Sequence, residues 1–120
     1  MAKMFSLGNH VDERGKLVVI DKALPFEVKR VFWMYDIKGM RGGHMHHKTN
    51  QALVCVSGGC EVFVNNGKDR GTFILDSPDK CLLLDPKDWH TMDKFRKGTV
   101  LLVLASTHFD KKDYVVKGYD

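Results

Sequence analysis

Three of the six histidines in this 120-residue sequence fall within four positions, in the stretch Arg41-Gly42-Gly43-His44-Met45-His46-His47-Lys48. Side chains alternate between the two faces of an extended strand, so we expect His44 and His46 on one face and Met45 and His47 on the other. Two imidazoles side by side can bind a metal or transfer protons near neutral pH. A glycine pair precedes them and a strand-like run follows. This setting favours a chemical role over a solvated strand end.

The elements that must position these histidines are predicted to be short strands. No segment keeps an apolar period of about 3.6 residues over three turns. Instead, about nine or ten strand-like runs alternate with turn residues every 8–12 positions, which is typical of a sandwich or barrel. One turn, Asn65-Asn66-Gly67, is predicted to be a type I′ hairpin turn, and 110–114 to form one helical turn. The other predicted runs are 4–10, 16–20, 29–37, 51–56, 60–64, 71–75, 81–84, 89–95 and 99–106.

Composition narrows the class of protein. The chain is 43 % hydrophobic and 28 % charged, which indicates one globular domain rather than a disordered segment. Its net charge of +4 is spread along the chain, so nucleic acid is not an expected partner. No apolar run approaches the roughly 20 residues of a membrane span, and no signal-peptide core is present. We expect three buried free thiols (Cys55, Cys60 and Cys81) and a cytoplasmic protein.

The histidine pair, the buried run after it and the Gly58-Gly59 turn resemble the first motif of the cupins, a jelly-roll barrel family. Metal-binding cupins have a glutamate a few residues after the pair, where this chain has Gln51. Their second motif has a histidine ligand after a proline, and here His90 follows Pro86 one place early. A neutral amide is a poor ligand for a hard or borderline cation. We therefore expect no metal, although a site formed by the pair and His90 stays an alternative.

The resemblance narrows further over nearly the whole chain, from Arg14-Gly15 to Tyr114. The chain resembles the sugar 3,4-ketoisomerases, small cupins that act on dTDP-4-oxo-6-deoxy-glucose in the making of 3-amino-3,6-dideoxy sugars. The resemblance implies a single cupin domain over residues 1–120 without metal or cofactor. It also implies a homodimer that exchanges N-terminal strands, and a downstream aminotransferase that takes the product. The segments that resemble the family are Arg41–His46, Gln51–Gly58, Val100–Ser106 and Asp113-Tyr114.

The family reaction fits a pair of imidazoles. Moving a ketone from C4 to C3 requires loss of the C3 proton, formation of an enediol(ate) and delivery of a proton to C4. Imidazoles have an ordinary pKa suited to both steps. By resemblance, we assign proton transfer to His44 and His46 and place Arg41 near the enediolate or the diphosphate.

Further candidates combine the resemblance with position along the strands. Alternation along 29–37 places Tyr35 on the same face as Val31 and Trp33. Tyr35 is expected to offer a pocket hydroxyl, with a core aromatic as the open alternative, and Trp89 to cover the thymine or the sugar. Gln51 is expected among the substrate-binding residues. His90 is expected to steer which face of C4 receives the proton, with Arg14 joining it across the exchanged strand. On these two residues we favour the galacto-configured product.

Three alternatives of other kinds remain. A metal-dependent cupin enzyme, such as a dioxygenase or phosphosugar isomerase, would use His44, His46 and His90 as ligands. A non-catalytic sugar-binding cupin would not need the histidine pair. A deoxysugar 3,5-epimerase is also a nucleotide-sugar cupin, but such enzymes tend to be longer and pair a histidine with a tyrosine.

Overall fold

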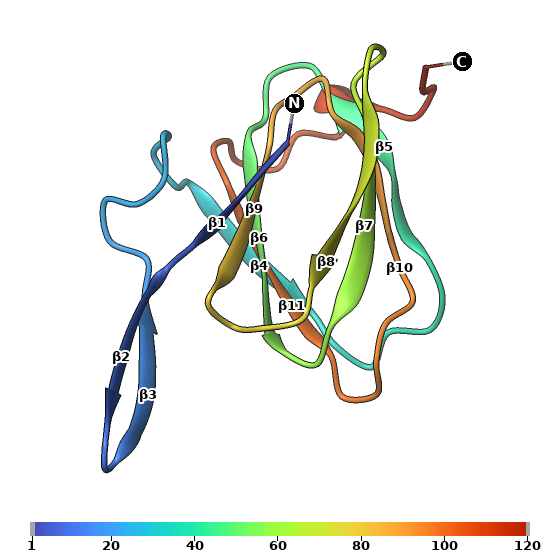
Figure 1. The fold of residues 1–120 in the computed structure, drawn as a ribbon. Coiled ribbons are helices and arrows are strands. Elements are labelled where there is room, and N and C mark those ends of the chain that lie inside the picture. The colour runs from blue at the N-terminus through green and yellow to red at the C-terminus, as the bar shows by residue number, and fades with distance from the viewer. Residues whose placement is uncertain (1, 120) are drawn as a thin grey trace.

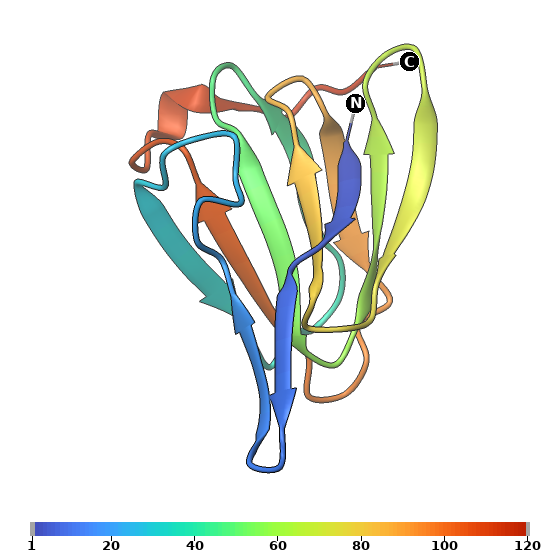
Figure 2. The ribbon, with the colours of Figure 1, turned by 60° about the vertical axis from the view of Figure 1, so that its left-hand side comes forward.

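The computed structural model describes residues 2–119, which form two facing five-stranded sheets and a separate hairpin (Figures 1 and 2). All paired strands are antiparallel, and from β4 to β12 the chain passes between the two sheets at every step except the β7–β8 hairpin, which makes the fold a jelly-roll barrel. The predicted all-β cupin fold is confirmed. The strands are β1 (Lys3–Ser6), β2 (Gly8–Asp12), β3 (Gly15–Val19), β4 (Arg30–Met34), β5 (Arg41–His46), β6 (Gln51–Ser57), β7 (Cys60–Asn65), β8 (Arg70–Leu75), β9 (Lys80–Leu84), β10 (Trp89–Asp93), β11 (Val100–Ala105) and β12 (Tyr114–Val115).

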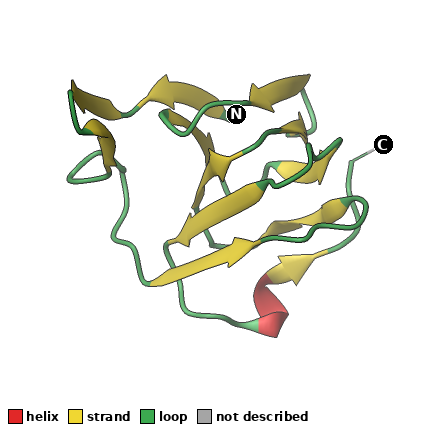
Figure 3. Cartoon of the chain, turned by 90° about the horizontal axis from the view of Figure 1, so that it is seen from below, coloured by secondary structure: helices red, strands yellow, loops and turns green. Residues whose placement is uncertain are grey.

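The histidine stretch belongs to one of the two sheets. One sheet has the strand order β1-β9-β6-β11-β4, and the other has the order β12-β5-β10-β7-β8. The second sheet contains the histidine stretch, in β5. The predicted helical turn is confirmed as the 3-10 helix η1 (Lys111–Asp113), which leads directly into β12 (Figure 3).

The core lies between the two sheets. Strand β6 directs Leu53 and Cys55 into the core, together with Leu101 and Val103 of the neighbouring β11. Ala52 and Val54 face outward yet stay buried, because the N-terminal segment packs over that side of the sheet. The strand is therefore apolar on both faces, which explains its unbroken hydrophobic sequence.

Strand β4 and the β2–β3 hairpin leave apolar surface uncovered in the single chain. Val31 and Trp33 are 49 % and 60 % exposed, whereas Phe32 and Met34 between them point toward the barrel. The predicted alternation along this strand is confirmed. The hairpin extends away from the barrel (Figure 2), and its strands pair only with each other among residues 2–119.

One predicted turn has a different geometry. The β7–β8 hairpin forms at Asn65–Arg70, but its loop has four residues, and only Gly67 has a positive φ, of 95°. A type I′ turn needs two positive φ angles, so that prediction was wrong. The Asn66 side chain instead accepts hydrogen bonds from the backbone of Lys68 and Asp69, which stabilises the longer loop.

The three cysteines are free and buried, as predicted. The Sγ atoms of Cys55 and Cys60 lie 3.6 Å apart without a disulfide bond. Within residues 2–119, no helix has the length and apolar character needed to cross a membrane.

Candidate active site

Three neighbouring strands bring the candidate residues together. Strand β5 lies between β10 and β12, and the register places His90 directly opposite His44 and Tyr114 directly opposite His46. Residues that face each other across neighbouring strands have side chains in contact range. The ring centroids of His44 and His90 are 5.1 Å apart, and the Tyr114 ring lies 4.8 Å from that of His44 and 4.6 Å from that of His46.

A glycine allows β5 and β10 to approach this closely. Gly42 has a φ of 85°, and a Cβ atom there would lie 2.9 Å from the carbonyl oxygen of His90 and 3.1 Å from Sδ of Met92. The pairing of the two strands shifts register between His90 and Thr91, next to this contact. Gly42 is therefore needed both for its backbone conformation and for its lack of a side chain.

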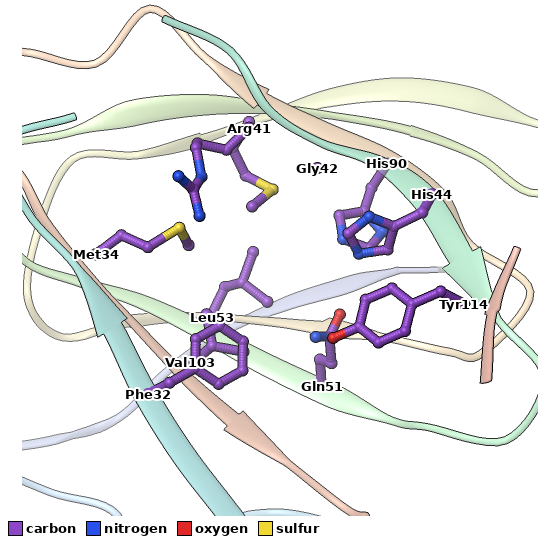
Figure 4. Close-up of a pocket in the computed structure, with 11 residues that line it drawn as sticks. Phe32, Met34, Arg41, Gly42, His44, Gln51, Leu53, His90, Val103 and Tyr114 are labelled. Carbon is purple, nitrogen blue, oxygen red and sulfur yellow. The ribbon is translucent and has the colours of Figure 1, made fainter. Parts of the chain in front are cut away.

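The histidines border a cavity of about 200 Å³ between the sheets (Figure 4). His44, His90 and Tyr114 lie at one end of it, with Gln51 beside the tyrosine. Arg41 lies toward the other end. The remaining lining residues are largely apolar: Phe32, Met34, Gly42, Leu53, Met92 and Val103. The cavity therefore joins a polar, imidazole-rich end to an apolar one.

His90 is held neutral. It is 2 % exposed, and its Nδ1 atom lies 2.9 Å from the carbonyl oxygen of Asp88. A carbonyl can only accept, so Nδ1 has the proton and Nε2 is left as an acceptor. Burial lowers the pKa of His90 to about 4, with smaller contributions from the positive forms of His44 and His46.

His46 has a buried carboxylate as its partner. Its Nδ1 atom lies 3.0 Å from Oδ2 of Asp113, and both side chains are 2 % exposed. Burial lowers the pKa of His46 below its usual value, and the hydrogen bond and negative charge of Asp113 oppose that effect. Nε2 of His46 is buried without a hydrogen-bond partner among the described residues.

Among residues 2–119, no carboxylate forms a hydrogen bond or ion pair with His44, which is half-buried at the cavity. Burial is the main cause that lowers its pKa, followed by the charge of His46. Gln51 is 4 % exposed, and its Oε1 atom has no hydrogen-bond partner within residues 2–119. An unpaired, buried amide oxygen at a cavity can accept a hydrogen bond from a ligand hydroxyl.

The structure places five of the eight residues predicted for the site at this cavity or next to it. His44, Gln51, His90 and Arg41 line it, and His46 lies directly behind His44.

The other three predicted residues lie elsewhere in the single chain. Tyr35 is 65 % exposed. It lies on the same outward face as Val31 and Trp33, so strand alternation directs its side chain away from the cavity. Trp89 lies on the outer face of β10, where its indole Nε1–H donates to the carbonyl of Val116, and it covers no cavity residue. Neither side chain lies at the cavity of the single chain, so a substrate-contacting role for either stays a prediction. Arg14 lies at the hairpin tip.

Sequence reasoning assigned no role to Tyr114, Asp113 or Thr49. The Asp-Tyr dipeptide was part of the family resemblance, but 67 positions separate Asp113 from the histidine that it contacts. Thr49 donates a short hydrogen bond to the same carboxylate. Only the pairing of β12 with β5 makes these residues neighbours.

Among residues 2–119, no group of three or more His, Cys, Asp or Glu side chains is arranged to hold a metal ion. The three histidine rings converge, but the centroids of His46 and His90 are 6.5 Å apart. A jelly-roll barrel with a histidine-lined cavity between its sheets makes this chain a cupin.

Comparisons with known proteins identify the family. The FdtA family, described as "WxcM-like, C-terminal", matches residues 1–120. The TDP-4-oxo-6-deoxy-alpha-D-glucose-3,4-oxoisomerase of Aneurinibacillus thermoaerophilus is 40% identical over 98% of this chain and 87% of its own. The chain therefore belongs to the FdtA family of sugar 3,4-ketoisomerases, and it is an isomerase.

Solved structures agree with this assignment. The TDP-quinovose 3,4-ketoisomerase WlaRB from Campylobacter jejuni is 35% identical, with a TM-score of 0.92 over 97% of this chain and 92% of its own. The TDP-fucose-3,4-ketoisomerase WlaRA, also from Campylobacter jejuni, is 30% identical, with a TM-score of 0.90 over 97% and 89%.

The close approach at Gly42 yields a test with a built-in control. Gly42 and Gly43 have φ angles of 85° and 82°, but a Cβ atom at Gly43 would meet nothing within 4 Å. We expect Gly43→Ala to lower the free energy of unfolding by about 1 kcal/mol, from backbone strain alone. Gly42→Ala should lower the free energy of unfolding by about 3 kcal/mol and reduce activity, because β10 must move away from β5. Chemical denaturation measures both, and equal losses would contradict the role given to the contact.

The buried neutral His90 predicts a loss of stability in acid. Its pKa falls from 6.5 to about 4 on folding, so between these values the unfolded chain binds a proton that the folded chain does not. The free energy of unfolding should therefore drop as the pH falls through this window, by about 3 kcal/mol in full. His90→Gln should flatten this part of the stability profile. His108→Gln, at an exposed histidine, should leave it unchanged.

Proposed function

We propose that this isomerase converts dTDP-4-oxo-6-deoxy-glucose into a dTDP-3-oxo-6-deoxy-hexose by proton transfer between histidines and the sugar. A base removes the C3 proton, which the C4 carbonyl acidifies, and the C4 oxygen gains a proton to give an enediol. Loss of the proton on the C3 oxygen and protonation of C4 then give the 3-oxo sugar. Oxidation at C3 balances reduction at C4, so the reaction needs no redox cofactor.

The observation that best supports this proposal is the cavity itself. At about 200 Å³ it is smaller than typical ligand pockets, which suits a hexose with the nucleotide left outside. Two imidazoles and a phenol border its polar end, where proton transfer needs them. The name of the Aneurinibacillus relative gives the same sugar nucleotide as its substrate.

The proposed roles follow from position. His44, which lines the cavity, and His46, directly behind it, move the protons. Gln51 binds a sugar hydroxyl through its unpaired Oε1 atom. Arg41 is exposed and lies toward the end of the cavity away from the histidines (Figure 4), so we assign it to the diphosphate rather than to the enediolate.

The finer assignments belong to the same proposal. We favour the galacto product because His90 lies at the cavity with Nε2 as its acceptor atom and Arg14 accompanies it in the resemblance. The product would supply an aminotransferase in the synthesis of a 3-amino-3,6-dideoxy sugar. Three free thiols fit a reducing compartment such as the cytoplasm.

Proton NMR in deuterium oxide tests the reaction directly. After chelator treatment, the protein should erase the C3 proton signal of dTDP-4-oxo-6-deoxy-glucose while a 3-oxo product forms. Trapping by an aminotransferase, or the C4 coupling where a proton is retained, gives the product configuration. His44→Asn should slow exchange at least about 100-fold, because one of the two imidazoles that transfer protons is lost. His47→Asn is the matched control, since His47 is exposed beside the pair, and it should stay active.

The other outcomes separate the alternatives. Activity that disappears on chelation and returns with a divalent ion would identify a metal-dependent cupin. A sugar nucleotide that binds without exchange, with unchanged affinity in His44→Asn, would identify a non-catalytic binding protein. Exchange at C5 together with C3 and a change of configuration there would indicate an epimerase.

We further propose that the active form is a homodimer in which the β2–β3 hairpin reaches the partner's cavity. Strand β1 pairs with β9 of its own chain, so the exchange concerns the hairpin. Exposed Val31 and Trp33 and the exposed hairpin residues Val11 and Leu17 form apolar surface that a second copy would bury. The Arg14 side chain at the hairpin tip is 87 % exposed and pairs only locally, with Asp12.

Mixing two inactive variants tests the exchange. If Arg14 serves the partner's cavity, Arg14→Ala and His44→Asn subunits should each be impaired alone. After denaturation together and refolding, mixed dimers have one intact cavity, with His44 from one subunit and Arg14 from the other. Activity should therefore recover toward one quarter of wild type, as expected for random pairing. If Arg14 acted within its own chain, no cavity would be intact and no activity would return.

A further inference from the structure

The carboxylate of Asp113 is the most densely bonded buried charge in the site. Its side chain is 2 % exposed. Its Oδ1 accepts the backbone N–H of Lys48 at 2.9 Å, and its Oδ2 accepts from the Thr49 hydroxyl and from Nδ1 of His46. Burial by itself would raise the pKa of Asp113, but these hydrogen bonds together hold it below its usual value. Asp113 is therefore an ionised acceptor.

This bonding fixes the tautomer of His46. An ionised carboxylate can only accept, so the Nδ1 atom of His46, 3.0 Å away, has the proton. The neutral ring then has its lone pair on Nε2, the atom that is buried without a partner. The other neutral tautomer would place a lone pair against the carboxylate. His46 is thus prepared to accept a proton at Nε2 and at no other atom.

A directed chain of hydroxyls fixes the carboxylate in turn. The Thr49 and Thr107 hydroxyl oxygens are 2.7 Å apart. Because Thr49 donates its one proton to Asp113, Thr107 must donate to Thr49. Thr49 follows β5 and Thr107 follows β11, so the two hydroxyls link the carboxylate to both of these segments.

The surroundings of His46 other than Asp113 lower its pKa, so the carboxylate is needed to favour the protonated ring. Burial, Arg30 of β4 and the adjacent His47 all lower the pKa of His46, whereas Asp113 raises it. His44 and His90 face the same ring, and His90 is neutral above about pH 4. Without the carboxylate, nothing among these groups would favour a proton on His46.

We propose that Asp113, held by Thr49, is a positioning residue that makes His46 a proton acceptor at Nε2 for the isomerisation. The inference rests on the proposed function, because it names the group that supports one of its bases. Asp113 acts through His46 and does not touch the cavity. Among the three histidines, His46 is then the base, since His44 and His90 have no carboxylate partner.

A purely structural role is the competing explanation, because the backbone carbonyl of Asp113 also accepts from His47 and its Oδ1 accepts from the Lys48 backbone. Both roles predict some loss of stability on mutation. They differ in what happens to the His46 ring, so the test must measure that ring.

The experiment compares Asp113→Asn with Thr107→Val. Loss of the negative charge lowers the pKa of His46, so the acid limb of the pH profile of kcat/KM should move to lower pH by about one unit. The kcat value should fall about 100-fold, with KM little changed. Thr107→Val removes only the outermost hydroxyl and should leave the acid limb in place. A structural role would lower activity at every pH without moving the limb.

Nitrogen-15 NMR of the histidine rings reports the tautomer in the wild-type protein and does not require an active enzyme, and the same measurement on Asp113→Asn reports the effect of the carboxylate. The neutral His46 ring should be the Nδ1–H tautomer, and in Asp113→Asn its titration should shift to lower pH. An Nε2–H tautomer, or a titration that is the same in both proteins, would overturn the inference. If the wild type does not isomerise the sugar, the proposed function fails, and the ring spectra still decide whether Asp113 sets the state of His46.

Discussion

The pairing of β5 with β10 on one side and β12 on the other is the constraint on which the site depends. Each histidine of the pair gains a partner from a different neighbour, His90 for His44 and Tyr114 for His46. A shift of one residue in either register would turn these side chains to the opposite face of the sheet. Gly42 secures one of the two pairings by allowing a backbone contact that a side chain would block.

Burial and charge then give the three imidazoles different properties. His90 is neutral because it is buried and its hydrogen-bond partner is an uncharged carbonyl. His44 is partly open to the cavity. His46 is as buried as His90, but a carboxylate lies against it. Three identical side chains within a few ångströms thus receive three environments, and an active site can separate the roles of its acid and base in this way.

The same sheets leave apolar surface exposed in the single chain. The N-terminal segment covers part of the outer face of the first sheet, and β4 leaves Val31 and Trp33 uncovered. The hairpin that follows β1 has no partner outside itself among the described residues. A small domain seldom leaves such apolar surface open without a use for it. The cavity and the exposed apolar surface both involve β4, whose residues alternate between the two.

The sequence by itself determined the strand pattern, the all-β class and the histidine pair, because alternation and turn residues are local properties. Alternation grouped Tyr35 with Val31 and Trp33, but the packing of β4 beside β11 decided that this face turns outward. The tertiary structure alone decided that Asp113 supports His46 and that Trp89 faces outward, since both depend on which strands pair. Contacts across 67 positions leave no local signal, because sheet register is a property of the whole barrel.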